Sequence, residues 1–164
     1  MRFPIAFRCF LQICFVVCLS VLALASPAQA VSLDSYVLRY LDASEPVELS
    51  LDESKTGLFS AADLSEGKRL FEANCKNCHA GGATLPDPTV PLSLEALRHA
   101  TPPRDAIAPL VAFMRQPMTY DGTEESFSCR DIPESWMSQA QVEHLAAFIL
   151  RAAQKAPGWG GMEF

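Results

Sequence analysis

Residues 75–79 read Cys75-Lys76-Asn77-Cys78-His79, a Cys-x-x-Cys-His motif that is the sequence signature of haem c attachment. Two thiols three residues apart lie on one face at the end of a helix, so both can form thioethers with the two vinyl groups of one porphyrin. The histidine that follows then points at the iron from one side. The motif therefore predicts one covalently bound haem c, attached through Cys75 and Cys78, with His79 as the proximal iron ligand.

Two other uses of a Cys-x-x-Cys pair fit this chain less well. A zinc site would need a second Cys/His pair, which the sequence does not offer. A thioredoxin-like disulfide would follow a strand at the start of a helix, whereas this motif ends a predicted helix. Both comparisons favour the haem interpretation.

The helix before the motif is predicted to begin after Ser60, a capping residue, and to run to about Lys76. Gly67 lies inside it, although a glycine in a helix interior costs about 1 kcal/mol relative to alanine. We therefore expect another helix to pack closely against the backbone at Gly67. The alternative is a poorly formed, frayed helix.

The rest of the chain predicts short helices joined by irregular loops. Downstream we expect a short helix at 92–98, a helix from Pro102 to about Arg115 and a loop from Pro117 to Pro133. A last helix is expected over Gln139–Ala153, capped by Ser138, with an apolar stripe of Val142, Leu145, Phe148, Ile149 and Ala152. Upstream, the alternating runs Tyr36–Leu41 and Val47–Leu51 predict a small β-hairpin. The fold class is therefore all-α with a small N-terminal hairpin.

Residues 1–30 have the pattern of a secretory signal peptide. Arg2 and Arg8 supply positive charge, Leu11–Leu24 is mostly apolar, and Ala28-Gln29-Ala30 is a small-x-small cleavage site. A retained membrane anchor is the alternative, but the apolar run is short for a span. We expect three parts: a cleaved signal peptide (1–30), an N-terminal hairpin extension (31–59) and a monohaem cytochrome c domain (60–164).

Charge and cysteine count limit the partners and point to one unexplained thiol. Removal of residues 1–30, which hold two arginines and no acidic residue, changes the net charge of the 164-residue chain from -6 to -8. Such an acidic protein is not expected to bind nucleic acid or to dock on anionic lipid, and we expect a monomer that is at most peripheral to a membrane. Three of the six cysteines leave with the signal peptide, so Cys129 remains beside the motif pair.

The distal iron ligand of a small c-type cytochrome usually lies on the loop before the last helix. The candidates there are Met118, Cys129 and Met137, because His99 and His144 read as surface residues. Met118 follows a helix directly and Met137 has little chain to carry it across the haem. Cys129 is preferred, because the chain between it and the last helix is long enough to cross the haem face. A metal would deprotonate its thiol, and the resulting thiolate would favour Fe(III) and a low reduction potential. A buried inert thiol or an intermolecular disulfide are the alternatives for Cys129.

Several further segments are shared with a known family. They are Glu66-Gly67-Lys68-Arg69-Leu70-Phe71, Gly81-Gly82, Ala100-Thr101-Pro102-Pro103-Arg104-Asp105, Thr119-Tyr120-Asp121-Gly122, Phe148-Ile149-Leu150 and Trp159-Gly160-Gly161. With these segments the chain resembles the cytochrome c-550 family, extrinsic haem proteins on the lumenal side of cyanobacterial photosystem II. The resemblance implies a class I cytochrome c fold with an N-terminal hairpin. It also implies a location in the thylakoid lumen, peripheral to the membrane.

One feature departs from that family. The family uses a second histidine as the distal ligand after the Tyr-Asp-Gly segment, and this sequence has no histidine there. Cys129 occupies about that place. The resemblance therefore implies a paralogue of cytochrome c-550, with Cys129 as the distal iron ligand.

The expected function is low-potential electron transfer in the lumen rather than enzyme catalysis. The implied partner is the lumenal face of photosystem II or a lumenal redox protein. One alternative is a structural extrinsic subunit that stabilises the oxygen-evolving complex. Another is a haem-based peroxidase or gas sensor, which is less favoured because no acid–base histidine lies near the predicted distal loop.

Overall fold

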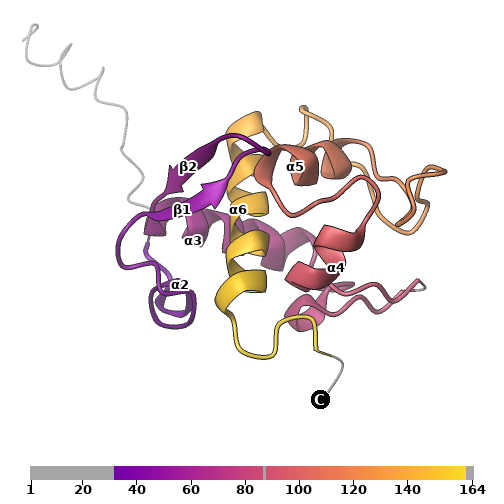
Figure 1. The fold of residues 1–164 in the computed structure, drawn as a ribbon. Coiled ribbons are helices and arrows are strands. Elements are labelled where there is room, and N and C mark those ends of the chain that lie inside the picture. The colour runs from indigo at the N-terminus through magenta and orange to yellow at the C-terminus, as the bar shows by residue number, and fades with distance from the viewer. Residues whose placement is uncertain (1–31, 87, 162–164) are drawn as a thin grey trace, which may run out of the picture. The chain divides into compact units, whose positions relative to one another are not determined.

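The computed structural model describes residues 32–86 and 88–161 of the protein, and the predicted signal peptide lies outside those residues. In chain order the elements are α2 (Ser35–Tyr40), β1 (Val47–Ser50), β2 (Thr56–Phe59), α3 (Ala61–Asn74), the 3₁₀ turn η1 (Ala80–Gly82), α4 (Leu94–His99), α5 (Ile107–Arg115) and α6 (Gln139–Lys155). Helices dominate, and the two strands form one antiparallel hairpin, as predicted (Figure 1). None of the helices within the described ranges has the length and apolar character needed to cross a membrane.

The hairpin is present, but one of its predicted strands is wrong. Residues Tyr36–Leu41 lie in and just after helix α2, and β1 pairs instead with β2, from Val47 opposite Phe59 to Ser50 opposite Thr56. Asp34 caps α2, because its Oδ1 accepts hydrogen bonds from two backbone N–H groups of the first turn, at 2.8 and 3.4 Å. Val37 and Leu41 are both 0% exposed. Arg39, halfway between them, is exposed, whereas a strand would place all three on one face; burial at a spacing of four but not of two matches a helix.

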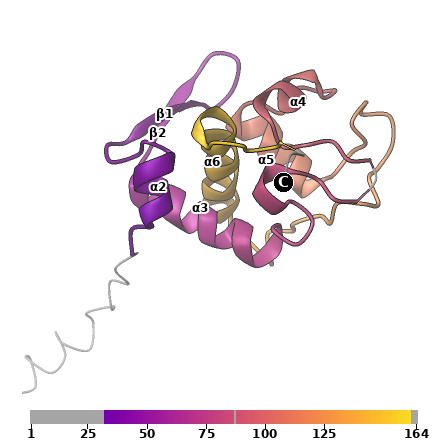
Figure 2. The ribbon, with the colours of Figure 1, turned by 90° about the horizontal axis from the view of Figure 1, so that it is seen from below.

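Helix α3 begins as predicted. Ser60 and Asp63 form a reciprocal capping box, and the helix ends at Asn74, two residues before the expected Lys76. A Cβ placed on Gly67 would lie 2.0 Å from the carbonyl oxygen of His144 in α6. The close helix contact expected at this glycine is therefore confirmed, and Figure 2 shows α3 and α6 crossing.

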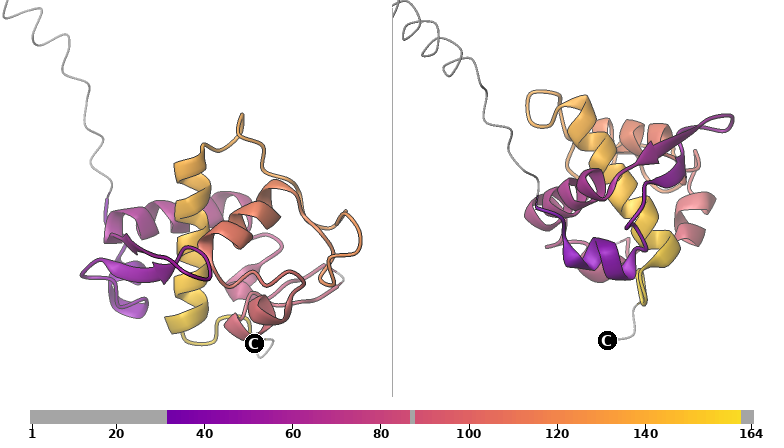
Figure 3. Two further views of the ribbon diagram at one scale, coloured as in Figure 1. Left: turned by 45° about the horizontal axis from the view of Figure 1, so that its top comes forward. Right: turned by 90° about the vertical axis from the view of Figure 1, so that its left-hand side faces the viewer.

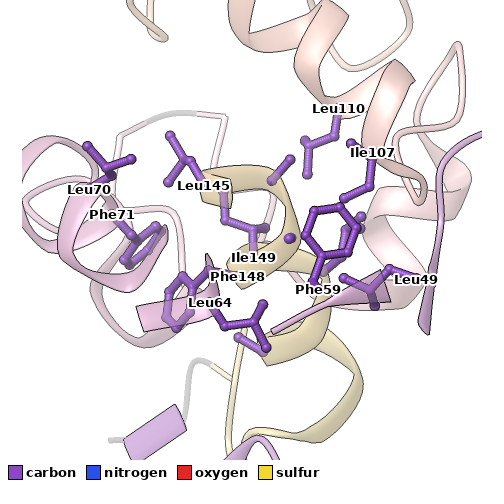
Figure 4. Close-up of a cluster of buried hydrophobic side chains, with 14 of the residues drawn as sticks. Leu49, Phe59, Leu64, Leu70, Phe71, Ile107, Leu110, Leu145, Phe148 and Ile149 are labelled. Carbon is purple, nitrogen blue, oxygen red and sulfur yellow. The ribbon is translucent and has the colours of Figure 1, made fainter. Parts of the chain in front are cut away.

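Helix α6 is the centre of the fold. Ser138 caps it, and it runs two residues past the predicted end, to Lys155. All five residues of the predicted stripe are buried, and so are Ala146, Ala147 and Leu150. A helix that is buried on most of its circumference is surrounded by other elements. Figure 1 shows α2 and the hairpin on one side of α6 and α4 and α5 on the other, and Figure 4 shows the apolar side chains that meet around it.

Helices α4 and α5 lie close to the predicted segments, with one clear difference. Helix α4 begins after the cap Ser93. Helix α5 begins at Ile107, five residues after the predicted start at Pro102. The backbone on both sides of Pro102 makes tertiary hydrogen bonds instead of helical ones: Thr101 N donates to Tyr120 O and Arg104 N donates to Leu97 O, both at 2.8 Å.

Two long loops face the same region of the molecule. One follows α3 and leads to α4, and the other joins α5 to α6; both lie on the side of α6 opposite the hairpin in Figures 1 and 3. The second loop is irregular, as predicted, with a single bridge between Met118 and Glu125. These loops enclose the candidate site.

Candidate functional site

A cavity of about 300 Å³ lies between the two loops and helices α4 and α5. This volume is at the lower end of the range of small-molecule and cofactor sites. The cavity is lined mainly by apolar side chains, among them Pro86, Val90, Leu92, Leu97, Leu110, Phe113 and Met118. Of the predicted haem-binding residues, Cys78, His79 and Cys129 line it.

The Cys-x-x-Cys-His motif continues the last turn of α3. Cys75 is the C-cap residue, and its N–H donates to Phe71 O at 2.8 Å. Cys78 N and His79 N both donate to Cys75 O, at 3.0 and 2.9 Å. Burial raises the pKa of the Cys75 thiol to about 12, with smaller contributions from the charges of Cys129 and Cys78. The backbone thus folds the two thiols and the imidazole into one compact turn beside the cavity.

The hydrogen bonds of His79 determine which ring nitrogen is available as a ligand. His79 Nδ1 lies 3.0 Å from the hydroxyl oxygen of Thr84. That hydroxyl donates its single hydrogen to Val90 O, so it accepts from Nδ1–H. Nε2 then carries the lone pair, and burial lowers the pKa of His79, which keeps the ring neutral near pH 7. A neutral imidazole with a hydrogen-bonded Nδ1–H is the form that ligates metals.

Cys129 reaches the same cavity from the opposite loop. It is a half-buried free thiol. Burial raises its pKa, the guanidinium of Arg104 opposes that rise, and the charge of Cys78 adds to it. Cys129, Cys78 and Arg104 all line the same cavity.

The other candidates for a distal ligand are distributed differently. Met118 lines the cavity. Met137 is 2% exposed and packs into the hydrophobic core. His99 is exposed, and His144 lies at the contact of α3 with α6, where its Nε2 is 3.4 Å from Asp63 Oδ1. The structure therefore brings Cys129 and Met118, but not the two histidines, to the cavity.

Arg104 is a cavity residue to which sequence reasoning assigned no role. Its side chain is buried against the aromatic ring of Phe113, with the guanidinium carbon 3.9 Å from the ring centroid. Charged side chains are rarely buried, so nothing in the sequence marked this arginine as part of a cavity. Thr84 was missed for a similar reason, because its role depends on a contact with His79 that no local pattern encodes.

The C-terminal tail fastens the loop that follows His79. Trp159 packs against Phe71 and Phe148, with ring centroids 5.4 and 5.8 Å apart, and its Nε1 donates to Leu92 O at 2.9 Å. A Cβ on Gly82 would lie 2.6 Å from the indole ring. The tail therefore supports the wall of the cavity that carries His79 and Thr84.

Comparison with known proteins identifies close relatives. The family model described as "Cytochrome c-550 domain" matches residues 38–164. A cytochrome c-550-like protein of Thermosynechococcus vestitus is 57% identical over 144 residues, which cover 87% of this chain and 82% of the relative. Photosystem II extrinsic protein V of Gloeobacter violaceus is 51% identical over 128 residues, 77% of this chain and 69% of the relative. The crystal structure of the PsbV2 cytochrome from Thermosynechococcus elongatus superposes with a TM-score of 0.77 at 59% identity, covering 79% of this chain and 99% of that chain.

Proposed function

Because the chain belongs to the cytochrome c-550 family, we propose that it is a low-potential c-type cytochrome with one haem, which transfers electrons in the thylakoid lumen and associates with photosystem II. The family membership confirms the resemblance, and the solved PsbV2 cytochrome confirms the cytochrome c fold. A haem cofactor follows from the family. The attachment residues, the distal ligand, the potential and the partner are our proposals.

The residues around the cavity fit a covalently attached haem. We assign the two thioethers to Cys75 and Cys78 and the proximal ligand to His79. Three observations support this assignment: the two thiols lie in one turn, Nε2 of His79 carries the free lone pair, and the adjacent cavity is mainly apolar. A haem c supplies an iron that carries one electron, and its apolar ring suits such a lining.

The distal ligand in this proposal is Cys129. The single observation that carries it is the position of Cys129 on the cavity that His79 also lines. A thiolate is anionic and donates strongly, so it favours the oxidised iron and lowers the reduction potential. Met118 is the competing ligand, since it lines the same cavity. A neutral thioether at that position would give a much higher potential.

The proposed setting is the lumenal side of the thylakoid membrane. The N-terminal pattern of residues 1–30 supports export, and the relative in Gloeobacter violaceus is named a photosystem II extrinsic protein. The net charge of -6 favours partners with neutral or basic surfaces. We propose a monomer that acts as an electron carrier rather than an enzyme, with photosystem II or a lumenal redox protein as its partner.

Visible and electron paramagnetic resonance spectra of the purified holoprotein, with a redox titration, test the ligand set. We expect low-spin thiolate signals in the oxidised protein and a potential well below that of a His/Met cytochrome. Cys129→Ser should abolish the thiolate signals, whereas the matched variant Met118→Leu should keep them. A potential in the His/Met range, or an unchanged spectrum in Cys129→Ser, would rule out Cys129 as the ligand.

A structural role in photosystem II is the second candidate, and the name of the Gloeobacter violaceus relative favours it. The two roles differ in whether the protein still supports photosystem II when its haem cannot carry an electron. If oxygen evolution by photosystem II falls when the protein is removed and is restored by a redox-inactive zinc-porphyrin form, the structural role is supported. If the protein does not co-purify with photosystem II, the structural role and the association are both excluded, and a lumenal redox protein remains as the partner of the carrier.

A further inference from the structure

Arg104 is a buried cation without an acidic partner. It is 8% exposed, and none of the ion pairs among residues 32–86 and 88–161 includes it. Burial lowers the pKa of Arg104, because the charged form is disfavoured away from water. A buried charge is expensive unless it is paired or hydrogen-bonded. Arg104 donates hydrogen bonds to neutral carbonyls, but no carboxylate of the described residues forms an ion pair with it, so the positive charge itself is left without a counter-charge.

Neighbouring elements hold the guanidinium in one place. Nη2 donates to Thr119 O at 2.7 Å and to Met118 O at 3.3 Å, on the loop after α5. The aromatic face of Phe113, from α5, covers the group. A planar guanidinium with this many constraints is a fixed charge rather than a flexible one.

The fixed charge faces the cavity that Cys129 lines. Arg104 lies just before α5 and Cys129 lies on the loop after it, so the two side chains line the cavity from different segments of the chain. Glu124 and Glu125 also line the cavity, but both are exposed, so water screens them. Of the other ionisable lining residues, Cys78 is assigned to a thioether, His79 to the proximal ligand, and Tyr120 donates its hydroxyl hydrogen to Ala96 O. Cys129 is the lining residue that becomes an anion on binding a metal.

We propose that Arg104 is a positioning residue that provides the counter-charge for the Cys129 thiolate, retains this ligand on the iron after reduction and raises the reduction potential above the value the thiolate alone would set. The proposal rests on the proposed function, since it needs Cys129 as the ligand. Reduction adds one negative charge to a site that already holds a thiolate. A nearby fixed cation therefore stabilises the reduced form more than the oxidised form.

The test uses the holoprotein and three variants. Arg104→Gln removes the charge and keeps hydrogen-bond donors, and Arg104→Lys keeps the charge. Arg151→Gln is the matched control, because Arg151 also donates to two carbonyls, Leu41 O at 2.7 Å and Asp42 O at 2.9 Å, but lies outside the cavity lining. Voltammetry at scan rates faster than ligand exchange gives the potential of the thiolate-ligated form, and equilibrium spectra give the fraction of reduced protein that keeps the thiolate.

We expect a lower potential and a smaller thiolate-ligated fraction after reduction in Arg104→Gln, with both values largely retained in Arg104→Lys and Arg151→Gln. Unchanged values in Arg104→Gln would overturn the proposal. Loss of haem in both Arg104 variants, with Arg151→Gln intact, would also overturn it. Arg104 would then be required for folding around the haem and not as a counter-charge. If the wild-type protein lacks thiolate signals, the assignment of Cys129 fails, and the inference on Arg104 fails with it. That outcome is separate from one in which the signals are present but insensitive to Arg104.

Discussion

Gly67 on α3 lies against the backbone carbonyl of His144 on α6, so closely that a Cβ at position 67 would be 2.0 Å from the carbonyl oxygen and 2.8 Å from Phe148 Cβ. Phe148 in turn contacts Phe71, with ring centroids 5.4 Å apart. Phe71 lies four residues before Cys75 on α3. The crossing of these two helices therefore fixes the position of the helix end from which the Cys-x-x-Cys-His motif emerges.

Gly67→Ala should separate α3 from α6 and destabilise the protein by about 2 kcal/mol or more, because the obstructing atom is backbone and cannot rotate away. Alanine would otherwise favour the helix by about 1 kcal/mol. Ala73→Gly, at an exposed position of the same helix, serves as the control. Its loss of stability measures the difference in helix propensity between alanine and glycine without a helix contact. Denaturant unfolding of the holoproteins gives both values. A Gly67→Ala protein as stable as wild type would show that the helices can move apart freely.

Thr84→Val should alter the iron through His79 without touching the metal. Valine keeps the shape of the side chain but removes the oxygen that lies 3.0 Å from His79 Nδ1. The imidazole then loses the hydrogen bond that increases its basicity, so the oxidised iron is less favoured and the reduction potential should rise. We also expect a loss of about 1 kcal/mol in stability. Redox titration compares the Thr84→Val variant with Thr84→Ser, which keeps the hydroxyl. Equal reduction potentials in the two variants would contradict the role of the Thr84 hydroxyl.

Trp159→Ala should loosen the loop that follows His79. The indole is half-buried against Phe71 and Phe148 and holds Leu92 through Nε1, so its removal should cost about 2–3 kcal/mol. Trp136→Ala is the control, since Trp136 is 42% exposed and contacts Arg130 at 5.1 Å on the distal loop. Thermal unfolding and protease sensitivity near residues 80–93 report the effect. Similar losses of stability in both variants would mean that Trp159 does not hold the loop that follows His79.

Acid should destabilise the N-terminal extension through Asp34. Burial opposes ionisation of Asp34, but hydrogen bonds from Lys68 Nζ, at 2.9 Å, and from Tyr36 N and Val37 N outweigh it and lower its pKa below the ordinary value of 3.8. A group with a lowered folded-state pKa stabilises fully above its unfolded pKa, and this contribution is lost as the pH falls through the folded pKa.

Unfolding measured from pH 7 to about pH 2 should therefore show a loss of stability that begins near pH 4. Asp34→Asn should reduce the slope of that loss, whereas Glu53→Gln, on the exposed turn of the hairpin, should not. An identical acid profile for Asp34→Asn and wild type would exclude Asp34 as a source of the pH dependence.

Local signals in the sequence determined several features by themselves. The capping boxes at Ser60 and Ser138 and the apolar stripe of α6 were predictable, because each depends on residues within one or two turns of the same helix. The Cys-x-x-Cys-His motif is local in the same sense. Gly67 was informative because a glycine inside a helix is unfavourable unless another backbone approaches it.

Other features depended on contacts between distant residues, and only the tertiary structure decided them. Helix α5 begins late because Arg104 N is bound to Leu97 O. The Tyr36–Leu41 run forms a helix because Val37 and Leu41 are buried while Arg39 between them faces solvent, which a strand would not allow. The buried position of Arg104 beside the Cys129 cavity depends on packing against Phe113. Such interactions join residues far apart along the chain, and their energies exceed the weak local preferences that a sequence pattern records.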